Sequence, residues 1–442
     1  MASKRAQFSS KLGIIAATVG SAVGLGNIWR FPYEAGTNGG GAFLICYCIF
    51  VFLLGMPTIC AEFSLGRFSK VGMPAAYRKA AGGARQWDFL GYAAILAAFM
   101  VLGFYSVVAG WTLEYIVESI KGFFQPEFTG DLHTRFSAFT ASWKAVGWTV
   151  VFIIINGFVI LGGVQKGIER VSSILMPILF VILIAFCINS LTMPGASKGL
   201  EFLFKPDFSK LNAQVILSAM GQAFFSLSLG MGCLVTYASY FGDNTPLIRT
   251  SMEIAILDTL VAILAGVIIF PAVFSFGMSP AEGPTLVFEV LPNIFSAIPG
   301  GMVWSLLFFI LLAVASLTSL ISVSEIVVSF LCDEFRMKRS MATIIVSLIT
   351  IILGVLCSLS FGPLSDLNMF NLLDYISSNI LMPLGGLGIC VFIGWKMKRD
   401  SVEQQLCQLA GARDWMYEYV IFCIRYIAPV GILAVFIAGL IQ

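Results

Sequence analysis

Apolar residues fill most of the chain in runs of about 20 residues, which short polar segments separate. An α-helix of that length crosses the hydrocarbon core of a bilayer. We therefore expect an all-α integral membrane protein that forms one domain over residues 1–442, with eleven transmembrane helices. The expected spans are residues 12–36, 41–66, 88–121, 145–162, 168–191, 213–241, 249–277, 302–332, 341–359, 368–395 and 415–440.

Small and polar residues interrupt two of these spans near their middle. The first span is broken at Gly20, Gly24, Gly26 and Asn27, and the sixth is broken at residues 226–232. The hydrocarbon core offers no partners to backbone N–H and C=O groups, so a spanning segment stays helical unless its opened backbone lines a site. Tight packing of small residues is the alternative explanation. Because both breaks also carry polar side chains, we expect the binding site of a secondary transporter between them.

Basic residues identify the cytoplasmic side. Lys and Arg gather before the first span and after every even-numbered span, whereas the loops at residues 123–143, 193–211 and 279–300 hold few. The positive-inside rule then places the N-terminus in the cytoplasm, and an odd number of spans places Gln442 outside. We expect a multi-pass protein of the cell's inner (plasma) membrane without a cleavable signal, because the apolar run from Leu12 is itself the broken first span.

Composition agrees with a membrane protein and excludes several functions. Hydrophobic residues make up 58% of the chain and charged residues 11%, and the net charge of +2 predicts no nucleic-acid partner. The ten cysteines lie in expected spans or on the cytoplasmic side, so we expect no disulfide framework. The single histidine, His133, lies in an outer loop and no HExxH motif is present, which argues against an intramembrane enzyme. A receptor that binds without translocating stays open as an alternative, as does the choice between monomer and dimer.

The two halves of the chain look related. Residues 22–27 (AVGLGN) in the first span resemble residues 227–232 (LSLGMG) in the sixth. Five spans separate the two copies, and an odd number means that the second copy enters the membrane from the opposite side. We therefore expect a 5+5 inverted repeat with discontinuous helices 1 and 6. Spans 1–5 (about 12–191) and 6–10 (about 213–395) form the repeat, and span 11 lies outside it.

The breaks belong to longer motifs that run through nearly the whole chain. These are residues 24–32 (GLGNIWRFP), 38–43 (NGGGAF), 62–67 (EFSLGR), 166–170 (KGIER), 176–177 (MP), 221–228 (GQAFFSLS) and 236–240 (TYASY). In this order they resemble the neurotransmitter:sodium symporter family, particularly its bacterial amino-acid transporters with eleven spans. The resemblance implies sodium-coupled uptake of amino acids by alternating access.

The resemblance also implies the residues of a substrate site. The substrate carboxylate is expected at the backbone of Leu25 and Gly26 with the Tyr105 hydroxyl, because free N–H groups at the start of a half-helix carry partial positive charge. The ammonium group is expected at Ala22, Phe225, Ser226 and Ser228. The pocket for the side chain is expected to be lined by Ser21, Val101, Tyr105, Phe225, Met231, Ser319 and Val323. Taken singly, each residue is better explained by core packing; as a set they suit large hydrophobic L-amino acids such as tryptophan, tyrosine and leucine.

Two sodium sites follow from the same resemblance. The first is expected to use the Ala22 carbonyl, Asn27, Ser226, Asp258 and the substrate carboxylate. The second is expected to use the carbonyls of Gly20, Val23 and Ala315 with the hydroxyls of Thr318 and Ser319. A hard cation prefers such oxygen ligands. For a single hydroxyl such as that of Ser226, a hydrogen bond back to its own helix is the alternative.

Asp258 affects the prediction of whether transport requires chloride. An ionisable residue inside a span is costly unless it is paired, so a functional role is its first interpretation. Chloride-dependent relatives place Asn at this position, and we therefore expect transport that does not require chloride. A carboxylate that anchors the cytoplasmic surface is the alternative.

The resemblance implies two gates built on ion pairs. Arg30 and Asp374 are expected to pair above the substrate, and Arg5 and Asp333 are expected to pair on the cytoplasmic side with Tyr240 nearby. Such pairs in wet vestibules contribute only about 0–1 kcal/mol each, which suits contacts that break in every cycle. Three further residues stand out. Glu62 is expected to be a structural partner of an unwound segment, and Phe8 and Glu325 stand where relatives often have Trp and Gln.

Overall fold

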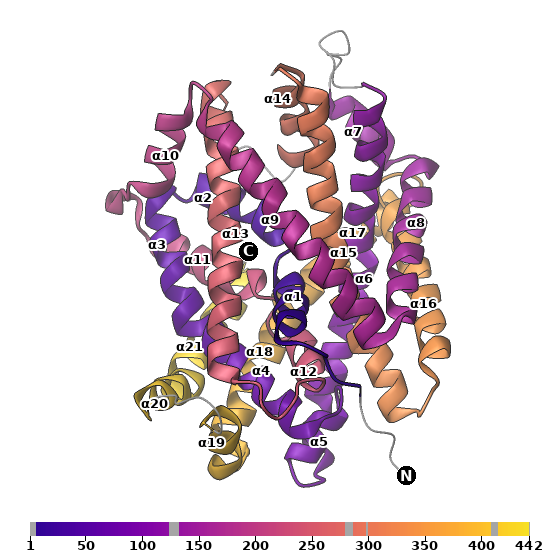
Figure 1. The fold of residues 1–442 in the computed structure, drawn as a ribbon, viewed down its shortest axis with the longest axis vertical. Helices are drawn as coiled ribbons and strands as arrows, with labels where there is room; N and C mark the ends of the chain where they lie inside the picture. The colour runs from indigo at the N-terminus through magenta and orange to yellow at the C-terminus, as the bar shows by residue number, and fades with distance from the viewer. Residues whose placement is uncertain (1–5, 123–131, 279–285, 298, 408–413, 442) are drawn as a thin grey trace.

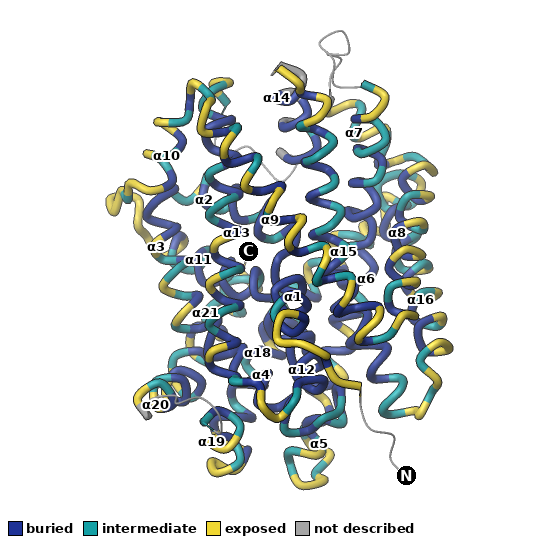
Figure 2. The backbone as a smooth tube through the Cα atoms, viewed as in Figure 1, coloured by how far each residue is buried: buried dark blue, intermediate teal, exposed yellow. Residues whose placement is uncertain are grey.

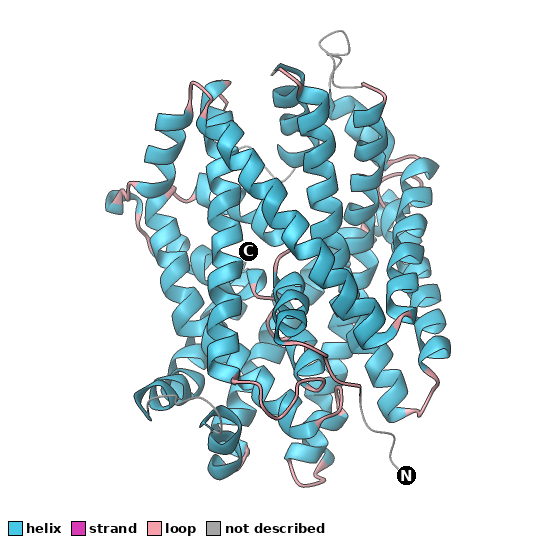
Figure 3. Ribbon diagram, in the orientation of Figure 1, coloured by secondary structure: helices cyan, strands magenta, loops and turns pink. Residues whose placement is uncertain are grey.

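Helices account for nearly all of the computed structural model, which describes residues 6–122, 132–278, 286–297, 299–407 and 414–441 (Figure 3). Across these ranges the only β-type pairing is one isolated bridge between Gly40 and Pro206. The all-α prediction is therefore confirmed.

Long apolar helices form the body of the molecule (Figure 1). Within the described ranges, nine helical stretches are long and apolar enough to cross a membrane, and one bent pair adds a tenth. The nine are Gly41–Ser69 (α3, Gly41–Phe50, and α4, Met56–Ser69), Arg85–Ile120 (α6, Asp88–Ile120), Trp143–Leu161 (α8), Val164–Leu191 (α9, Arg170–Leu191), Leu247–Ser275 (α13), Gly301–Glu334 (α15), Arg339–Leu359 (α16), Ser365–Lys396 (α17, Met369–Tyr375, and α18, Met382–Val391) and Trp415–Ile441 (α20, Asp414–Phe422, and α21, Ala428–Ile441). The bent pair is Lys11–Ala22 (α1) with Gly26–Thr37, which ends in α2 (Phe31–Thr37).

The sixth expected span consists of two short helices, α11 (Ala213–Ser226) and α12 (Cys233–Ala238). Neither is long enough alone to cross a bilayer. Every expected span thus contains helix, while eleven crossings of the membrane stay a prediction. The remaining short helices are α5 (Ala75–Ala80), α7 (Leu132–Thr140), α10 (Ala196–Phe204), α14 (Leu291–Ala297) and α19 (Arg399–Cys407).

Exposed positions run along the outer helices, as Figure 2 shows for α8 and α16, and many of them carry large apolar side chains. Phe158, Val181 and Ile352 are among the most exposed large side chains. In water such a surface would be unfavourable, whereas lipid tails are as apolar as the side chains themselves. The long helices α6 and α15 are far more buried and pack against each other. They form the interior against which the broken helices lie.

Both broken spans start with a capped helix and stop where small residues occur. Ser10 Oγ accepts a hydrogen bond from the Gly13 N–H and begins α1, and Asn212 Oδ1 does the same for the Val215 N–H at α11. After α1 the chain becomes extended at Val23, with φ −68° and ψ 110°. The helical geometry returns at Gly26, and the two parts meet at an angle of 52°.

The break between α11 and α12 depends on positive φ angles. Ser228, Gly230 and Gly232 have φ values of 52°, 82° and 82°. A side chain at Gly230 would collide with the carbonyl oxygen of Met382, so this glycine lets the unwound segment lie directly on α18. The N–H of Gly230 donates to Glu62 Oε1 at 2.8 Å. The expected role of Glu62 as a structural partner of an unwound segment is therefore confirmed.

Candidate functional site

A cavity lies between the two breaks. The residues around it come from α1 and its break, α6, the α11–α12 break, α15 and the segment around α18. They are Ser21, Ala22, Gly24, Gly26, Val101, Phe104, Tyr105, Phe225, Ser226, Ser228, Met231, Ser319, Val323, Ser378 and Met382. All the predicted substrate residues line it except Leu25, whose backbone N–H donates to Tyr105 Oη at 3.2 Å.

Four lining residues were missed at the level of sequence: Gly24, Phe104, Ser378 and Met382. Gly24 belongs to the break in the first span, so its position in the sequence was enough to predict that it lines the site. Ser378 and Met382 lie four residues apart and therefore on one helical face, and Ser378 follows the predicted gate residue Asp374 by one turn. That spacing pointed to a shared face, although not to the cavity.

Hydrogen bonds fix the opened backbone of the first span. Ser319 Oγ donates to the Val23 carbonyl at 3.3 Å, and Ser228 Oγ donates to the Ser21 carbonyl at 3.1 Å. The hydroxyl of Ser21 is buried and has no hydrogen-bond partner among the described residues. This hydroxyl is therefore a polar group of the cavity wall that is available to a ligand or to water.

A fully buried polar cluster lies at one end of the cavity. Asn27 Nδ2 donates to Ser226 Oγ at 2.9 Å and to Asp258 Oδ1 at 2.8 Å. Ser226 Oγ donates to Asp258 Oδ2 at 2.7 Å, and the Tyr47 hydroxyl lies 3.4 Å from the same oxygen. The structure therefore brings together three predicted sodium ligands and adds Tyr47, which sequence reasoning missed.

Asp258 has only neutral partners in this cluster. It is fully buried in α13, so the alternative of a surface anchor is wrong. In the described part of the chain no Lys or Arg forms an ion pair with it. A buried carboxylate without a cationic partner is strongly unfavourable, and oxygen atoms gathered around it fit a small hard cation.

The residues of the second expected ion site lie where α1 meets α15. A side chain at Gly20 would come within 3.1 Å of the Thr318 Cβ, and Ser319 reaches the Val23 carbonyl. Thr318 Oγ1 donates to the Ala315 carbonyl at 3.1 Å, within its own helix. The structure thus brings all five residues to one contact between two helices, with backbone carbonyl oxygens on the α1 side and hydroxyl and carbonyl oxygens on the α15 side.

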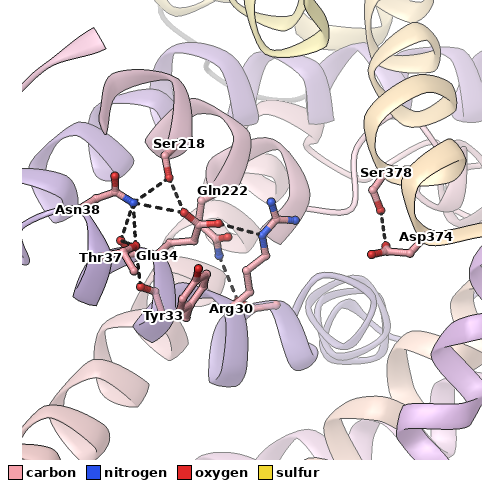
Figure 4. A network of polar contacts seen from close by, with 10 residues as sticks. Arg30, Tyr33, Glu34, Thr37, Asn38, Ser218, Gln222, Asp374 and Ser378 are labelled. Atoms are coloured by element: carbon pink, nitrogen blue, oxygen red, sulfur yellow. Dashed lines mark hydrogen bonds and ion pairs between the residues drawn. The ribbon is translucent and has the colours of Figure 1, made fainter. Parts of the chain in front are cut away.

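The expected outer ion pair is not formed. Arg30 Nε lies 3.5 Å from Glu34 Oε1, and Asp374 Oδ1 accepts a hydrogen bond from Ser378 Oγ at 2.9 Å (Figure 4). Across the described residues no ion pair links Arg30 to Asp374. Glu34 stands one helical turn after Arg30 and takes its guanidinium locally, which is the physical reason for the difference. The Arg30 guanidinium also stacks over the ring of Phe225 at 4.4 Å.

The cytoplasmic gate is only partly described. Arg5 lies outside the described residues, and Asp333 Oδ2 accepts a hydrogen bond from the Gly72 N–H at 2.7 Å. The Tyr240 hydroxyl donates to Glu325 Oε1 at 2.6 Å, and Arg339 donates to both carboxylate oxygens of Glu325 at 2.8 and 2.6 Å. Glu325 is thus a paired, buried carboxylate beside the predicted gate.

Phe8 and Arg78 add to this inner region. Phe8 packs edge-on against Tyr237 and Tyr240, so an aromatic ring is retained where relatives often carry Trp. Arg78 in α5 donates to Asp88 at the start of α6 and to Glu334 at the end of α15. These hydrogen bonds raise the pKa of the Arg78 guanidinium, which stays charged and ties three helices together at the inner face.

The comparison with known protein families identifies the chain. The model described as "Sodium:neurotransmitter symporter family" matches residues 5–126 and 131–442. The chain belongs to this family. It is therefore a sodium-dependent membrane transporter and not an enzyme.

Individual relatives match along nearly the whole of this chain. An uncharacterized sodium-dependent transporter of Bacillus subtilis, YhdH, is 39% identical over 98% of this chain and 97% of its own length. The sodium-dependent serotonin transporter of Drosophila melanogaster is 27% identical over 98% of this chain and 76% of its own length. The crystal structure of MhsT in complex with L-phenylalanine is similar with a TM-score of 0.90 and 43% identity, covering 99% of this chain and 100% of MhsT.

Proposed function

We propose that this symporter takes up hydrophobic L-amino acids, including aromatic ones, together with sodium. The observation that carries the proposal is the composition of the cavity between the two breaks. Val101, Phe104, Met231, Val323 and Met382 make its wall largely apolar, and among the described residues no Asp, Glu, Lys or Arg lines it. A basic or acidic side chain would find no partner there, whereas a hydrophobic one gains by leaving water. L-Phenylalanine in the similar MhsT structure supports this class.

The backbone at the first break supplies the polar end of the site. The N–H groups of Leu25 and Gly26 stand where helical geometry resumes, and the Tyr105 hydroxyl accepts from Leu25. A substrate carboxylate would be favoured by the partial positive charge of this helix start, where it would take the place of the Tyr105 hydroxyl on the Leu25 N–H. The ammonium group is proposed to lie at Ala22, Phe225, Ser226 and Ser228, where carbonyl and hydroxyl oxygens are available.

Two sodium sites are part of the proposal. Asn27, Ser226 and Asp258 form the first with the Ala22 carbonyl, and the uncompensated charge of Asp258 is the support for a cation there. The amide nitrogen of Asn27 now faces the carboxylate, so ion binding requires the amide to turn its oxygen inward. Gly20, Val23, Ala315, Thr318 and Ser319 form the second.

Asp258 is also proposed to make chloride unnecessary. A fixed carboxylate at this place balances the charge of a sodium ion, and a bound anion would duplicate it. We further propose the 5+5 inverted repeat, a cytoplasmic N-terminus and an external C-terminus, as the basic residues predict.

Uptake and binding assays test the proposed function. Purified protein in sealed proteoliposomes is expected to accumulate labelled tryptophan, tyrosine or leucine when sodium is high outside, and not when potassium replaces sodium. Because the substrate carboxylate is proposed to complete the first sodium site, substrate affinity should rise with sodium concentration, and substrate should raise sodium affinity by the same factor. Equal substrate binding in the two salts would contradict the shared site. Sodium-dependent binding without accumulation would show a receptor.

A further inference from the structure

The outer end of the first span carries a charged network that the proposed binding chemistry does not use. Glu34 Oε2 accepts hydrogen bonds from Ser218 Oγ at 2.5 Å and from Asn38 Nδ2 at 3.3 Å, while Oε1 lies 3.5 Å from Arg30 Nε. The Glu34 side chain is 18% exposed. Groups from α11 and from the end of α2 therefore hold this carboxylate in place. It is a fixed partner for Arg30 rather than a mobile surface charge.

Arg30 stands next to the roof of the substrate cavity. Its guanidinium carbon lies 4.4 Å from the centre of the Phe225 ring, and Phe225 lines the cavity. Any movement of the guanidinium therefore changes the contact with an aromatic side chain that faces the substrate. Its own side chain is 40% exposed, so water is available while it moves.

A second carboxylate, that of Asp374, lies on the side of Arg30 away from Glu34. In the view of Figure 4, Arg30 lies between Glu34 and Asp374. Asp374 is held by Ser378 Oγ at 2.9 Å, and Ser378 also lines the substrate cavity. Arg30 Nε lies within ion-pair distance of Glu34 and, among the described residues, not of Asp374, so a move of the guanidinium onto Asp374 would draw it away from Glu34. Glu34 and Asp374 are thus alternative partners of Arg30.

We infer that Glu34 is a positioning residue that holds Arg30 in the open arrangement of the outer gate, in competition with Asp374. The inference rests on the proposed function, because it takes substrate binding and the Arg30–Asp374 pair as the closed arrangement. The Ser218–Glu34–Asn38 network sets how often Arg30 is released to close over the substrate.

The exchange is feasible because neither ion pair is strong. Partly exposed pairs have small free energies, and a ligand that binds the closed arrangement shifts the population toward it. Loss of the open-state partner should therefore tighten substrate binding by about two- to fivefold. The opposite sign would follow from charge alone, since removal of a carboxylate makes the vestibule less attractive to sodium.

Substrate affinity at saturating sodium tests the inference. Glu34→Gln is expected to lower the substrate Kd by about two- to fivefold without a matching rise in the maximal uptake rate. Ser218→Ala loosens the same carboxylate and should act in the same direction with a smaller effect. Asp374→Asn should raise the Kd. In the double variant Glu34→Gln/Asp374→Asn, the Kd should equal that of Asp374→Asn alone. Without the Asp374 carboxylate, Arg30 cannot form the closed pair, so its release from Glu34 has no effect on binding.

The control is Glu201→Gln, which removes an exposed carboxylate that pairs with Lys205 elsewhere on the outer face. It should leave the Kd unchanged. An unchanged or higher Kd in Glu34→Gln would overturn the inference, as would a tightening that persists in the Asp374→Asn background. The comparison uses whichever amino acid the wild type binds. A substrate outside the hydrophobic class would therefore defeat the proposed function and leave the test of Glu34 intact.

Discussion

At the scale of single residues, the site combines side chains that are ordinary by themselves. Asp258 is the exception, because a fully buried carboxylate whose side-chain partners in the described part of the chain are Asn27, Ser226 and Tyr47 is unusual without a cation. Met231 is the other decisive residue, since its thioether lies in the cavity wall at the end of an unwound segment. Each leads to a prediction about one substitution.

Replacement of Asp258 by Asn should weaken sodium-driven uptake, because the neutral amide no longer balances the charge of the ion. Chloride should then restore part of the activity, whereas wild-type uptake should be the same in chloride and in gluconate. Uptake into proteoliposomes under both anions measures the effect. Loss of wild-type uptake in gluconate would contradict the role given to Asp258.

Replacement of Met231 by Phe should discriminate between substrates by size. A stiffer, bulkier ring in a packed site commonly costs about 1–3 kcal/mol, which corresponds to a loss of tryptophan affinity of roughly 5- to 150-fold. Alanine should bind almost as before. Met252→Phe is the matched control, because Met252 lies in α13 and is not among the cavity residues. Equal weakening of tryptophan and alanine by Met231→Phe would place Met231 outside the side-chain pocket.

At the scale of elements, function depends on where helices stop. The two breaks bring opened backbone to one cavity, and each break is held by contacts with an intact neighbour. For the second break the neighbour is α18, whose Met382 carbonyl occupies the space that a side chain at Gly230 would need. The conformation and the close approach both require glycine at this position.

Gly230→Ala should therefore lower thermal stability and impair substrate binding. Left-handed backbone costs a non-glycine residue roughly 1–2 kcal/mol, and the clash with Met382 adds to that. Gly277→Ala is the control, since Gly277 has φ 66° and an added Cβ would meet no atom of the described residues within 4 Å. It should show the backbone cost alone and bind substrate normally. Thermal unfolding and a binding isotherm for both variants make the comparison, and normal binding by Gly230→Ala would refute the packing argument.

At the scale of the whole molecule, the site joins distant parts of the chain. Its residues come from α1, α6, α11, α13, α15 and α18, so a ligand that contacts all of them links most of the bundle. Arg78 ties α5, α6 and α15 together at the inner face.

Sodium and substrate should therefore stabilise the protein more together than separately. A ligand present at 100 times its Kd contributes about 2.7 kcal/mol to the stability of the folded state. Thermal unfolding in sodium with substrate should occur at a higher temperature than in sodium alone or in potassium with substrate at equal ionic strength. Asp258→Asn should lose most of the joint effect. A purely additive response in the wild type would argue against one ion shared with the substrate.

The sequence by itself determined the membrane class, the extent of the spans and the places where two of them break. Hydrophobic length and the clustering of glycine act locally, so they can be read along the chain. The family motifs identified most of the cavity residues. The spacing of Arg30 and Glu34, four residues apart, also allows an ion pair along one helix to be predicted from the sequence.

Only the tertiary structure decided which of these side chains meet. Tyr47 joins Asp258 across 211 residues of sequence, and Ser378 and Met382 turn their face of the helix toward the cavity. It also decided that Arg30 pairs with Glu34 while Asp374 pairs with Ser378. Such choices depend on how helices rotate and approach one another. Packing of the whole bundle fixes that rotation, so it cannot be predicted from a local pattern of residues.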